Sequence, residues 1–244
     1  MISLERRDGH PLRIGHRGAP ALAPENTLGS FRAAVHAGVD LVEFDVVALE
    51  SGQLVVAHSI EEIVPETPTL EQTLRFFVDE ATDIGLHLDL KLTQREHEVI
   101  EALRGFDLAG RSFVSSVYIS TARAIAALDG ELRTGFTVPR SILGLTEHGR
   151  GAPVARAGLW ALRLVTPPLI RPLLALTRAS AVVIHHTVVT AASVRAAHAH
   201  GAAVIAWTVD EPDELARVDE AGVDAVVTND PRIFVSDFVS TLET

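Results

Sequence analysis

Charged residues two positions apart interrupt two otherwise apolar segments of the chain: Glu43 with Asp45, and Asp89 with Lys91. Residues i and i+2 of a β-strand point to the same face, so each pair would project its charges from one side of a strand. A single acidic pair also occurs on solvent-facing strands, but apolar residues flank Glu43 and Asp45 on both sides and favour a buried strand. Buried carboxylates need a partner. In a chain without Cys, three of them suit a hard divalent ion, Mg²⁺ or Ca²⁺, ligated by oxygen.

Two histidines, His16 and His58, lie on either side of Glu43 and Asp45 in the sequence. Histidine titrates near neutral pH, so these side chains are candidates for a general base and a general acid. Arg17 directly follows His16 and offers a planar fork of donors that suits a phosphate group. Together these residue types predict chemistry on a phosphorylated substrate.

The rarest polar residues fall in the same segments. The chain has 20 Arg but a single Lys, Lys91, and only two Asn, Asn26 and Asn229. A composition so biased against Lys and Asn keeps them where Arg or Asp would not serve. All three therefore add to the candidate site.

Composition excludes several other classes of protein. The 244 residues carry a net charge of −11, which argues against a nucleic-acid binder. The absence of Cys excludes a disulfide scaffold and a Cys nucleophile. The first residues form no apolar signal-peptide core, and the apolar stretch 157–176 is interrupted by Arg and Pro, so we expect neither secretion nor a membrane span. These features predict a cytoplasmic protein.

Strand-like and helix-like segments alternate along almost the whole chain. The expected strands are Leu12–Gly15, Asp40–Val47, Gly85–Leu90, Arg111–Ser115, Arg133–Thr137, Ala181–His185, Ala203–Thr208 and Asp224–Thr228, with Gln53–Ala57 as a hairpin partner of the second. The expected helices are Asn26–Ala37, Leu70–Thr82, Glu96–Arg104, Thr121–Leu128, Ala191–His200 and Glu211–Ala221. This alternation predicts one α/β domain over residues 1–244, a (β/α)8 TIM barrel. An open doubly wound sheet is the alternative, although no G-x-G-x-x-G follows the first strand.

A TIM barrel carries its active site at the carboxyl ends of the strands. The polar residues collect at those ends in this chain, and several of them belong to longer motifs. The motifs are Gly15-His16-Arg17-Gly18, Pro24-Glu25-Asn26-Thr27, Phe31-x-x-Ala34, Gly38-Val39-Asp40-x-x-Glu43-x-Asp45-Val46, Leu54-Val55-Val56-x-His58, Asp89-x-Lys91, Trp207-Thr208-Val209 and Thr228-Asn229-Asp230-Pro231. In this order and spacing, over about residues 13–234, they resemble the glycerophosphodiester phosphodiesterases. The resemblance implies the TIM barrel that the strand pattern predicts independently.

The resemblance also implies a reaction and its catalytic residues. His16 and His58 match the general acid/base pair, and Glu43 and Asp45 match two metal ligands. Asp89 stands where the family usually has Glu as the third ligand. The implied reaction is metal-dependent hydrolysis of a glycerophosphodiester to glycerol 3-phosphate and an alcohol. Either water or the neighbouring glycerol hydroxyl is the attacking group.

Five further residues match the substrate side of the family's site. Arg17 matches the phosphate-contacting arginine, and Lys91 matches the lysine two residues after the third metal ligand. Glu25 and Asn26 match the loop that supports the first strand's residues, and Trp207 matches an aromatic residue at the barrel mouth. The expected partner is therefore a small-molecule phosphodiester.

One departure from the family changes the expected substrate range. The small domain that the family inserts after the hairpin histidine is largely deleted, since only residues 59–67 separate His58 from Pro68. A more open site admits larger or lipid-bearing phosphodiesters, so a phospholipase-D-like or lysophospholipid-cleaving activity is an alternative. Ser59 replaces the family's Asp, and Asp89 its Glu, which leaves a catalytically silent phosphodiester-binding barrel as a second alternative.

Residues 140–178 differ in charge from the rest of the chain. They contain six Arg and one Glu and are rich in Leu and Pro. Two hypotheses follow: a basic, apolar segment that contacts an anionic membrane, or a barrel helix that forms a contact between copies in a homo-oligomer.

Overall fold

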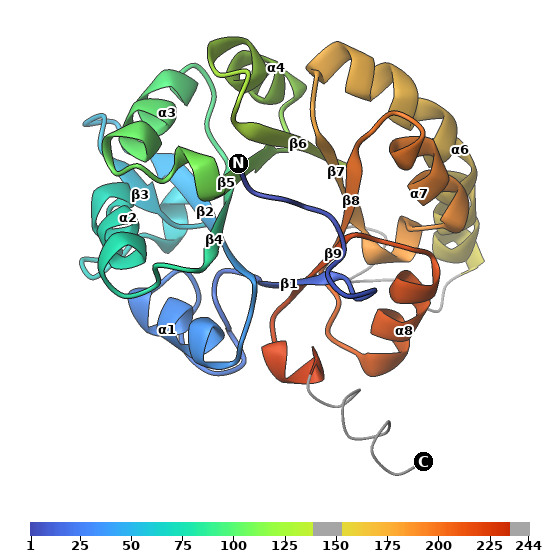
Figure 1. Cartoon of the computed structure of the whole chain (residues 1–244), viewed down its shortest axis with the longest axis horizontal. Coiled ribbons are helices and arrows are strands. Elements are labelled where there is room, and N and C mark those ends of the chain that lie inside the picture. Colours follow the sequence, from blue (N-terminus) through green and yellow to red (C-terminus); the bar gives the residue numbers. More distant parts are fainter. Residues whose placement is uncertain (139–152, 235–244) are drawn as a thin grey trace.

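Parallel strands close into a barrel in the computed structural model, which describes residues 1–138 and 153–234 (Figure 1). Within those residues eight strands are parallel, and β1 pairs with both β2 and β9, which closes the ring. The strands are β1 (Leu12–Gly15), β2 (Leu41–Ala48), β4 (Gly85–Leu90), β5 (Ser112–Ser116), β6 (Arg133–Val138), β7 (Ala181–His185), β8 (Ala203–Trp207) and β9 (Ala225–Thr228). The short β3 (Leu54–Val56) pairs antiparallel with β2. The predicted TIM barrel is confirmed, and the open-sheet alternative is wrong.

Helices surround the barrel as an outer ring (Figure 1). They are α1 (Leu28–His36), α2 (Leu70–Asp79), α3 (Glu96–Gly105), α4 (Ile119–Leu128), α6 (Pro153–Thr177), α7 (Ala191–His198) and α8 (Pro212–Glu220). Short 3-10 turns occur at η1 (Ile60–Glu62), η2 (Ala109–Arg111), η3 (His186–Val188) and η4 (Pro231–Phe234). The only regular element between β3 and α2 is η1, so the connection that follows His58 is short.

Threonine side chains fix where several helices begin. The Thr27 hydroxyl accepts a hydrogen bond from the Ser30 backbone N–H, so α1 begins at Leu28 rather than at Asn26 as the sequence predicts. Asn26 instead has a φ of 55°, a left-handed conformation outside a helix. Thr69 forms a capping box with Gln72 at the start of α2.

Strand alternation separates an apolar layer inside the barrel from the helix-facing core. Leu41 and Phe113 belong to the cluster that fills the barrel interior towards its amino-terminal end. Gly135 makes room for Phe113, because a Cβ at that glycine would lie 2.5 Å from the phenyl ring. Two residues further along the same faces, the side chains become polar: Glu43 on β2 and Ser115 on β5. The barrel interior is therefore filled by apolar side chains towards the amino-terminal ends of the strands and is polar towards their carboxyl ends.

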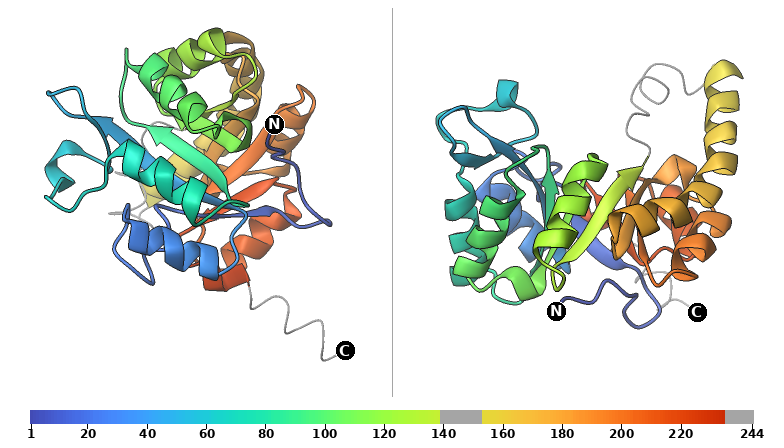
Figure 2. Two further views of the ribbon diagram at one scale, coloured as in Figure 1. Left: turned by 60° about the vertical axis from the view of Figure 1, so that its left-hand side comes forward. Right: turned by 90° about the horizontal axis from the view of Figure 1, so that it is seen from above.

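Helix α6 is the longest helix among the described residues, and more than half of its residues from Gly158 to Thr177 are exposed. Its segment Gly158–Thr177 is long and apolar enough to cross a membrane by length and composition alone, but Ile170 and Leu174 pack into the core beside β7 and β8. It contacts α4 and α7 as a ring helix does. The first half of α6 rises beyond the carboxyl ends of the strands (Figure 2, right).

Candidate active site

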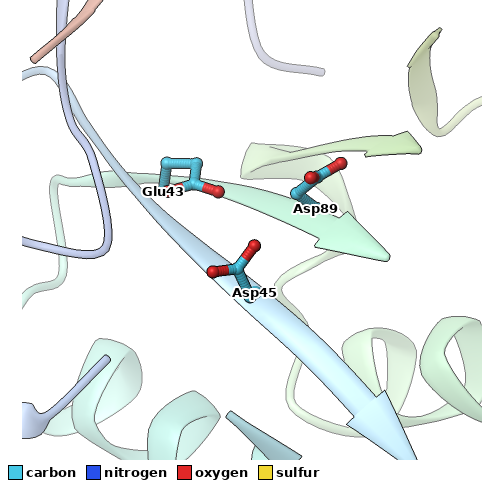
Figure 3. A group of neighbouring side chains, drawn as sticks. All are labelled: Glu43, Asp45 and Asp89. Carbon is cyan, nitrogen blue, oxygen red and sulfur yellow. The ribbon is translucent and has the colours of Figure 1, made fainter. Parts of the chain in front are cut away.

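Three carboxylates from two neighbouring strands converge at the carboxyl end of the barrel (Figure 3). Glu43 and Asp45 project from β2 and Asp89 projects from β4, where Asp89 is the register partner of Asp45. Each side chain offers an oxygen, and these oxygens lie within 4.8 Å of one another. All three residues are buried. The i, i+2 spacing of the sequence thus produces the predicted convergence.

The electrostatics of the cluster are those of a cation site. Burial raises the pKa of Glu43, and the charges of Asp45 and Asp89 raise it further. Burial also opposes ionisation of Asp45, but the hydrogen bond with His58 and the charges of Lys91 and Arg17 outweigh it and hold that pKa well below its usual range. The donor set consists of three buried oxygens that repel one another. It fits a hard divalent ion such as Mg²⁺ or Ca²⁺.

Two cations from the chain share these carboxylates. Lys91 Nζ lies 3.0 Å from Asp45 Oδ1 and also contacts Asp89. Arg17 Nε lies 2.9 Å from Asp45 Oδ2. Burial lowers the pKa of Lys91, but Asp89 and Asp45 more than reverse this and raise the pKa above its ordinary value. Both side chains therefore stay charged beside any anion that enters the site.

Arg17 is held in a strained turn directly after β1. Its φ is 48°, and its backbone N–H donates to Glu43 Oε2 at 2.8 Å. Gly18 follows with a φ of 90°, and a Cβ there would collide with Ser30 at the start of α1. Backbone strain of this kind is concentrated at functional sites. The motif His-Arg-Gly is thus a turn that aims a guanidinium at the carboxylates.

The predicted loop residues Glu25 and Asn26 form hydrogen bonds with Arg17 and Asp45, respectively. Glu25 Oε1 accepts a hydrogen bond from Arg17 Nη1 at 2.8 Å. Asn26 donates from Nδ2 to Asp45 Oδ2 at 3.1 Å and accepts the Asp45 backbone N–H at 3.2 Å. In this structure they support Arg17 and Asp45.

The two candidate histidines occupy different surroundings. His58 Nδ1 lies 2.8 Å from Arg17 Nη2 and 3.3 Å from Asp45 Oδ2. His16 Nδ1 lies 2.7 Å from Asn229 Oδ1 instead. Burial and the charge of Arg17 lower the pKa of His16, which favours a neutral ring. His58 is thus tied to the metal-ligand cluster, and His16 to the loop after β9.

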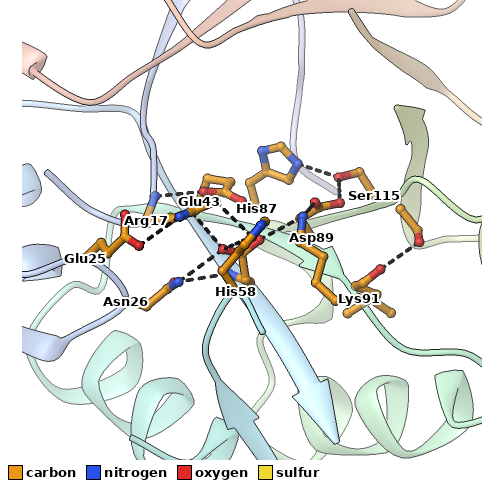
Figure 4. Close-up of polar contacts among 12 residues, drawn as sticks. Arg17, Glu25, Asn26, Glu43, His58, His87, Asp89, Lys91 and Ser115 are labelled. Atoms are coloured by element: carbon orange, nitrogen blue, oxygen red, sulfur yellow. Dashed lines mark hydrogen bonds and ion pairs between the residues drawn. The ribbon is translucent and has the colours of Figure 1, made fainter. Parts of the chain in front are cut away.

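A buried pair that the sequence analysis did not assign supports the third carboxylate. Ser115 Oγ donates to Asp89 Oδ1 at 2.9 Å and lies 2.9 Å from His87 Nε2 (Figure 4). His87 stands two residues before Asp89 on the same face of β4, and burial lowers its pKa to about 4. The i, i+2 spacing could have identified His87, but Ser115 emerges only from the register of β4 with β5.

Trp207 lies apart from the carboxylates, on the other side of the barrel. It ends β8, where its ring packs edge-on against His185 at 5.3 Å between centroids. Its indole Nε1 is buried and has no hydrogen-bond partner among the described residues. The structure therefore brings nine of the ten predicted residues into the region of β1, β2, β3 and β4, and leaves Trp207 on an opposite wall.

Comparisons with known proteins agree with one another. The model of the glycerophosphoryl diester phosphodiesterase family matches residues 16–84 and 60–233. A glycerophosphodiester phosphodiesterase of Caldanaerobacter subterraneus is 26% identical over 92% of this chain and 96% of its own, and one of Arabidopsis thaliana is 26% identical over 92% and 72%.

Solved structures show the same fold. A glycerophosphodiester phosphodiesterase from Parabacteroides distasonis superposes with a TM-score of 0.73 at 19% identity, covering 95% of this chain and 98% of the other. A phosphodiesterase from Oleispira antarctica in complex with the product sn-glycerol-3-phosphate superposes with a TM-score of 0.71 at 23% identity, covering 94% and 97%.

Proposed function

The chain belongs to the glycerophosphoryl diester phosphodiesterase family and is a phosphoric diester hydrolase, and on that premise we propose how its residues act. The proposed reaction is metal-dependent hydrolysis of glycerophosphodiesters to glycerol 3-phosphate and an alcohol. The observation that carries it is the meeting of three buried carboxylates with Arg17, Lys91 and His58 in one cluster. We propose His58, within that cluster, and His16, which contacts the loop after β9, as the acid/base pair.

Glu43, Asp45 and Asp89 would hold the divalent ion. When bound, it would act as a Lewis acid that polarises a phosphoryl oxygen. Lys91, which contacts Asp45 and Asp89, would pair with a second phosphoryl oxygen of the substrate. The choice between Mg²⁺ and Ca²⁺ is tested by metal reconstitution.

The hydrogen bonds suggest a division of labour between the two histidines. His16 is proposed as the base, since its neutral ring has a nitrogen available to take a proton from the attacking hydroxyl. His58 is proposed as the acid that protonates the leaving alkoxide. Asp45, 3.3 Å from its Nδ1, supplies the negative charge against which a protonated ring is held. Arg17 Nη2 also lies 2.8 Å from His58 Nδ1. If the guanidinium moved to contact the phosphoryl group, His58 Nδ1 would be free to donate to Asp45.

A substrate panel tests this proposal. We expect glycerophosphocholine to yield glycerol 3-phosphate and choline, with turnover abolished by EDTA and restored by a divalent ion. The variant His16→Ala should be inactive, whereas His198→Ala, at the opposite end of the barrel, should turn over like the wild type. EDTA-insensitive turnover, or an active His16→Ala, would count against the proposal. Detection of a cyclic phosphate by ³¹P NMR would identify the glycerol hydroxyl as the attacking group, and its absence would favour water.

Lysophospholipid cleavage is the second candidate reaction. The short connection between β3 and α2 favours it, since Ile60 and Val64 there are exposed apolar residues near the mouth. Lysophosphatidylcholine in the same panel separates the two activities. Choline release from it at a higher kcat/KM than from glycerophosphocholine would assign the lipid substrate.

The outward side of α6, called the α6 face, is the candidate partner surface. Its exposed residues are almost all apolar, and the face includes no carboxylate. They are Trp160, Ala161, Leu164, Val165, Pro168, Leu169, Arg171, Pro172, Ala175 and Leu176. Residues 140–152 of the predicted segment 140–178 lie outside the described residues. Exposed apolar area of this extent is typical of an interaction site.

We infer that a second copy of the chain covers the α6 face. The face runs along the helix from Trp160 to Leu176, so a lipid surface approaching the mouth would reach only its first turns, whereas a second helix would cover all of it. Trp160 and Arg171 are eleven residues apart, about three turns, and lie on one edge of α6. Antiparallel pairing about a two-fold axis would set Arg171 of each copy against Trp160 of the other.

Sedimentation equilibrium at tens of micromolar tests this pairing. A dimer in the wild type that dissociates in Leu164→Glu, but persists in the matched control Val78→Glu on α2, is the expected result. A wild-type monomer would contradict it. Flotation of that monomer with anionic vesicles, abolished by Leu164→Glu, would assign the α6 face to a membrane instead. The cytoplasmic location and the single-domain organisation over residues 1–244 stay predictions.

A further inference from the structure

A carboxylate outside the proposed catalytic set, Asp210, binds the loop that holds His16. Asp210 lies between β8 and α8, and its Oδ1 accepts the backbone N–H of Asn229 at 2.8 Å and the hydroxyl of Thr228 at 3.1 Å. Its Oδ2 accepts a third hydrogen bond, from Asn229 Nδ2 at 2.7 Å. Three donors fix the plane of this carboxylate and connect it to the end of β9.

These contacts determine which way the Asn229 amide points. A carboxylate only accepts hydrogen bonds, so Nδ2 of Asn229 faces Asp210 and Oδ1 faces His16. Asn229 Oδ1 lies 2.7 Å from His16 Nδ1, and a carbonyl oxygen only accepts. Nδ1 of His16 therefore carries the proton. A neutral imidazole has one N–H, so Nε2 keeps its lone pair.

We propose that Asp210 is a positioning residue for His16: through Asn229 it holds the ring in the Nδ1–H tautomer and makes Nε2 the nitrogen that accepts a proton. This inference rests on the proposed function of His16 as the base. The three residues belong to neighbouring parts of the barrel, since β9 lies between β8 and β1 (Figure 1). An Asp at position 229 could not donate to Asp210, which is why one of the chain's two Asn stands there.

The isosteric variant Asp210→Asn tests the relay. The carboxamide oxygen of the variant can still accept the backbone N–H of Asn229. The carboxamide Nδ2 at position 210 then faces the side chain of Asn229. The Asn229 amide would turn its oxygen towards this donor and its own Nδ2 towards His16. We expect the ring to shift to the Nε2–H tautomer. Replacing the aspartate of a Ser-His-Asp triad costs about 10⁴-fold in kcat through a wrong tautomer, and one bond further away we expect about 10- to 100-fold, with KM within about 2-fold.

The matched control is Asp230→Asn in the same loop. Asp230 pairs with Arg232 at 2.6 Å and not with Asn229 or His16 among the described contacts. The variant Asp230→Asn should therefore keep His16 in the Nδ1–H tautomer and keep the wild-type kcat. Asp210→Glu keeps a carboxylate and should restore the Nδ1–H tautomer with an intermediate kcat, so a folding defect of Asp210→Asn alone would not decide the outcome.

The tautomer is read from the ¹⁵N shifts of the ring nitrogens in histidine-labelled protein without substrate, with the His16 signals assigned by their loss in His16→Ala. Retention of Nδ1–H in Asp210→Asn would overturn the proposal. So would a tautomer change that leaves kcat equal to that of Asp230→Asn. The tautomer of His16 is measured without substrate, so this measurement does not depend on turnover. If His16→Ala is fully active, it is the proposed function that fails, whatever the tautomer shows.

Discussion

Carboxylates at the two ends of the barrel differ in their surroundings. At the amino-terminal end, each has its own donors: Asp40 accepts the backbone N–H of Arg13 at 2.8 Å and pairs with the Arg13 side chain. Asp224 accepts the Val204 N–H and the His198 ring, both at 2.7 Å. At the carboxyl end, Glu43, Asp45 and Asp89 crowd together and share two cations.

The difference separates stability from function. A carboxylate that has its own backbone donor and its own side-chain partner connects the start of one strand to the next and stabilises the fold. Three buried carboxylates within 4.8 Å repel one another, and the pKa of Glu43 stays raised even with Lys91 and Arg17 beside the cluster. The size of a cavity does not mark the functional end, since one of about 290 Å³ lies at the amino-terminal end, lined by Arg133, Ser180, His198 and others.

The largest effect should come from Glu43→Gln. Removal of one proposed ligand should reduce kcat/KM about 10³-fold, since a bound metal contributes several kcal/mol to the transition state. The metal-free variant should melt no lower than the wild type, because the pKa of Glu43 is raised and its charge opposes folding. Calorimetry in EDTA beside a turnover assay measures both. A large fall in melting temperature would place Glu43 with the structural carboxylates.

Ser115→Ala should have the next largest effect, on metal binding. The hydrogen bond from Ser115 orients Asp89, and loss of such support typically weakens metal affinity about 10- to 100-fold. Titration of Mn²⁺ followed by EPR gives the Kd directly. Ser193→Ala, which removes a hydroxyl from the cap of α7, is the control and should leave the Kd unchanged. An equal Kd for Ser115→Ala would remove Ser115 from the site.

Asp40→Asn should show the reverse pattern. It weakens the pairing with Arg13 and Arg7 at the amino-terminal end, which we expect to lower the free energy of unfolding by about 1–2 kcal/mol. Its kcat/KM should equal the wild-type value. Urea unfolding and the turnover assay together test this. A loss of activity in a folded Asp40→Asn variant would contradict the assignment of the amino-terminal carboxylates to stability alone.

The smallest effect concerns pH. Burial opposes ionisation of Asp129, but the N–H groups of Glu131 and Leu132 and the charge of Arg104 outweigh it and lower the pKa below 3.8. The unfolded chain then binds the proton more readily, so the stabilisation is present above 3.8 and is lost as pH falls through the lower, folded pKa. Asp129→Asn should therefore make the free energy of unfolding depend less on pH in the acid range than in the wild type. Acid titrations that coincide for the two proteins would contradict this.

The sequence predicted the barrel because each strand is short, apolar and followed by a helix, and because i, i+2 spacing puts Glu43 with Asp45 on one face. It also predicted the family. It could not predict Ser115 or Asp210, since their contacts depend on the register of β4 with β5 and on ring closure through β9. The sequence pattern predicts the start of α1 two residues early, because it does not reveal that Asn26 adopts a positive φ, in which its side chain contacts Asp45.

The proposed metal dependence is tested most directly by turnover of glycerophosphocholine by the metal-stripped protein, before and after addition of Mg²⁺ or Ca²⁺, with Glu43→Gln and Asp40→Asn in parallel. We expect no turnover without metal, recovery on addition in the wild type and in Asp40→Asn, and no recovery in Glu43→Gln at the same metal concentration. Full turnover by the metal-stripped wild type, or normal recovery in Glu43→Gln, would contradict it.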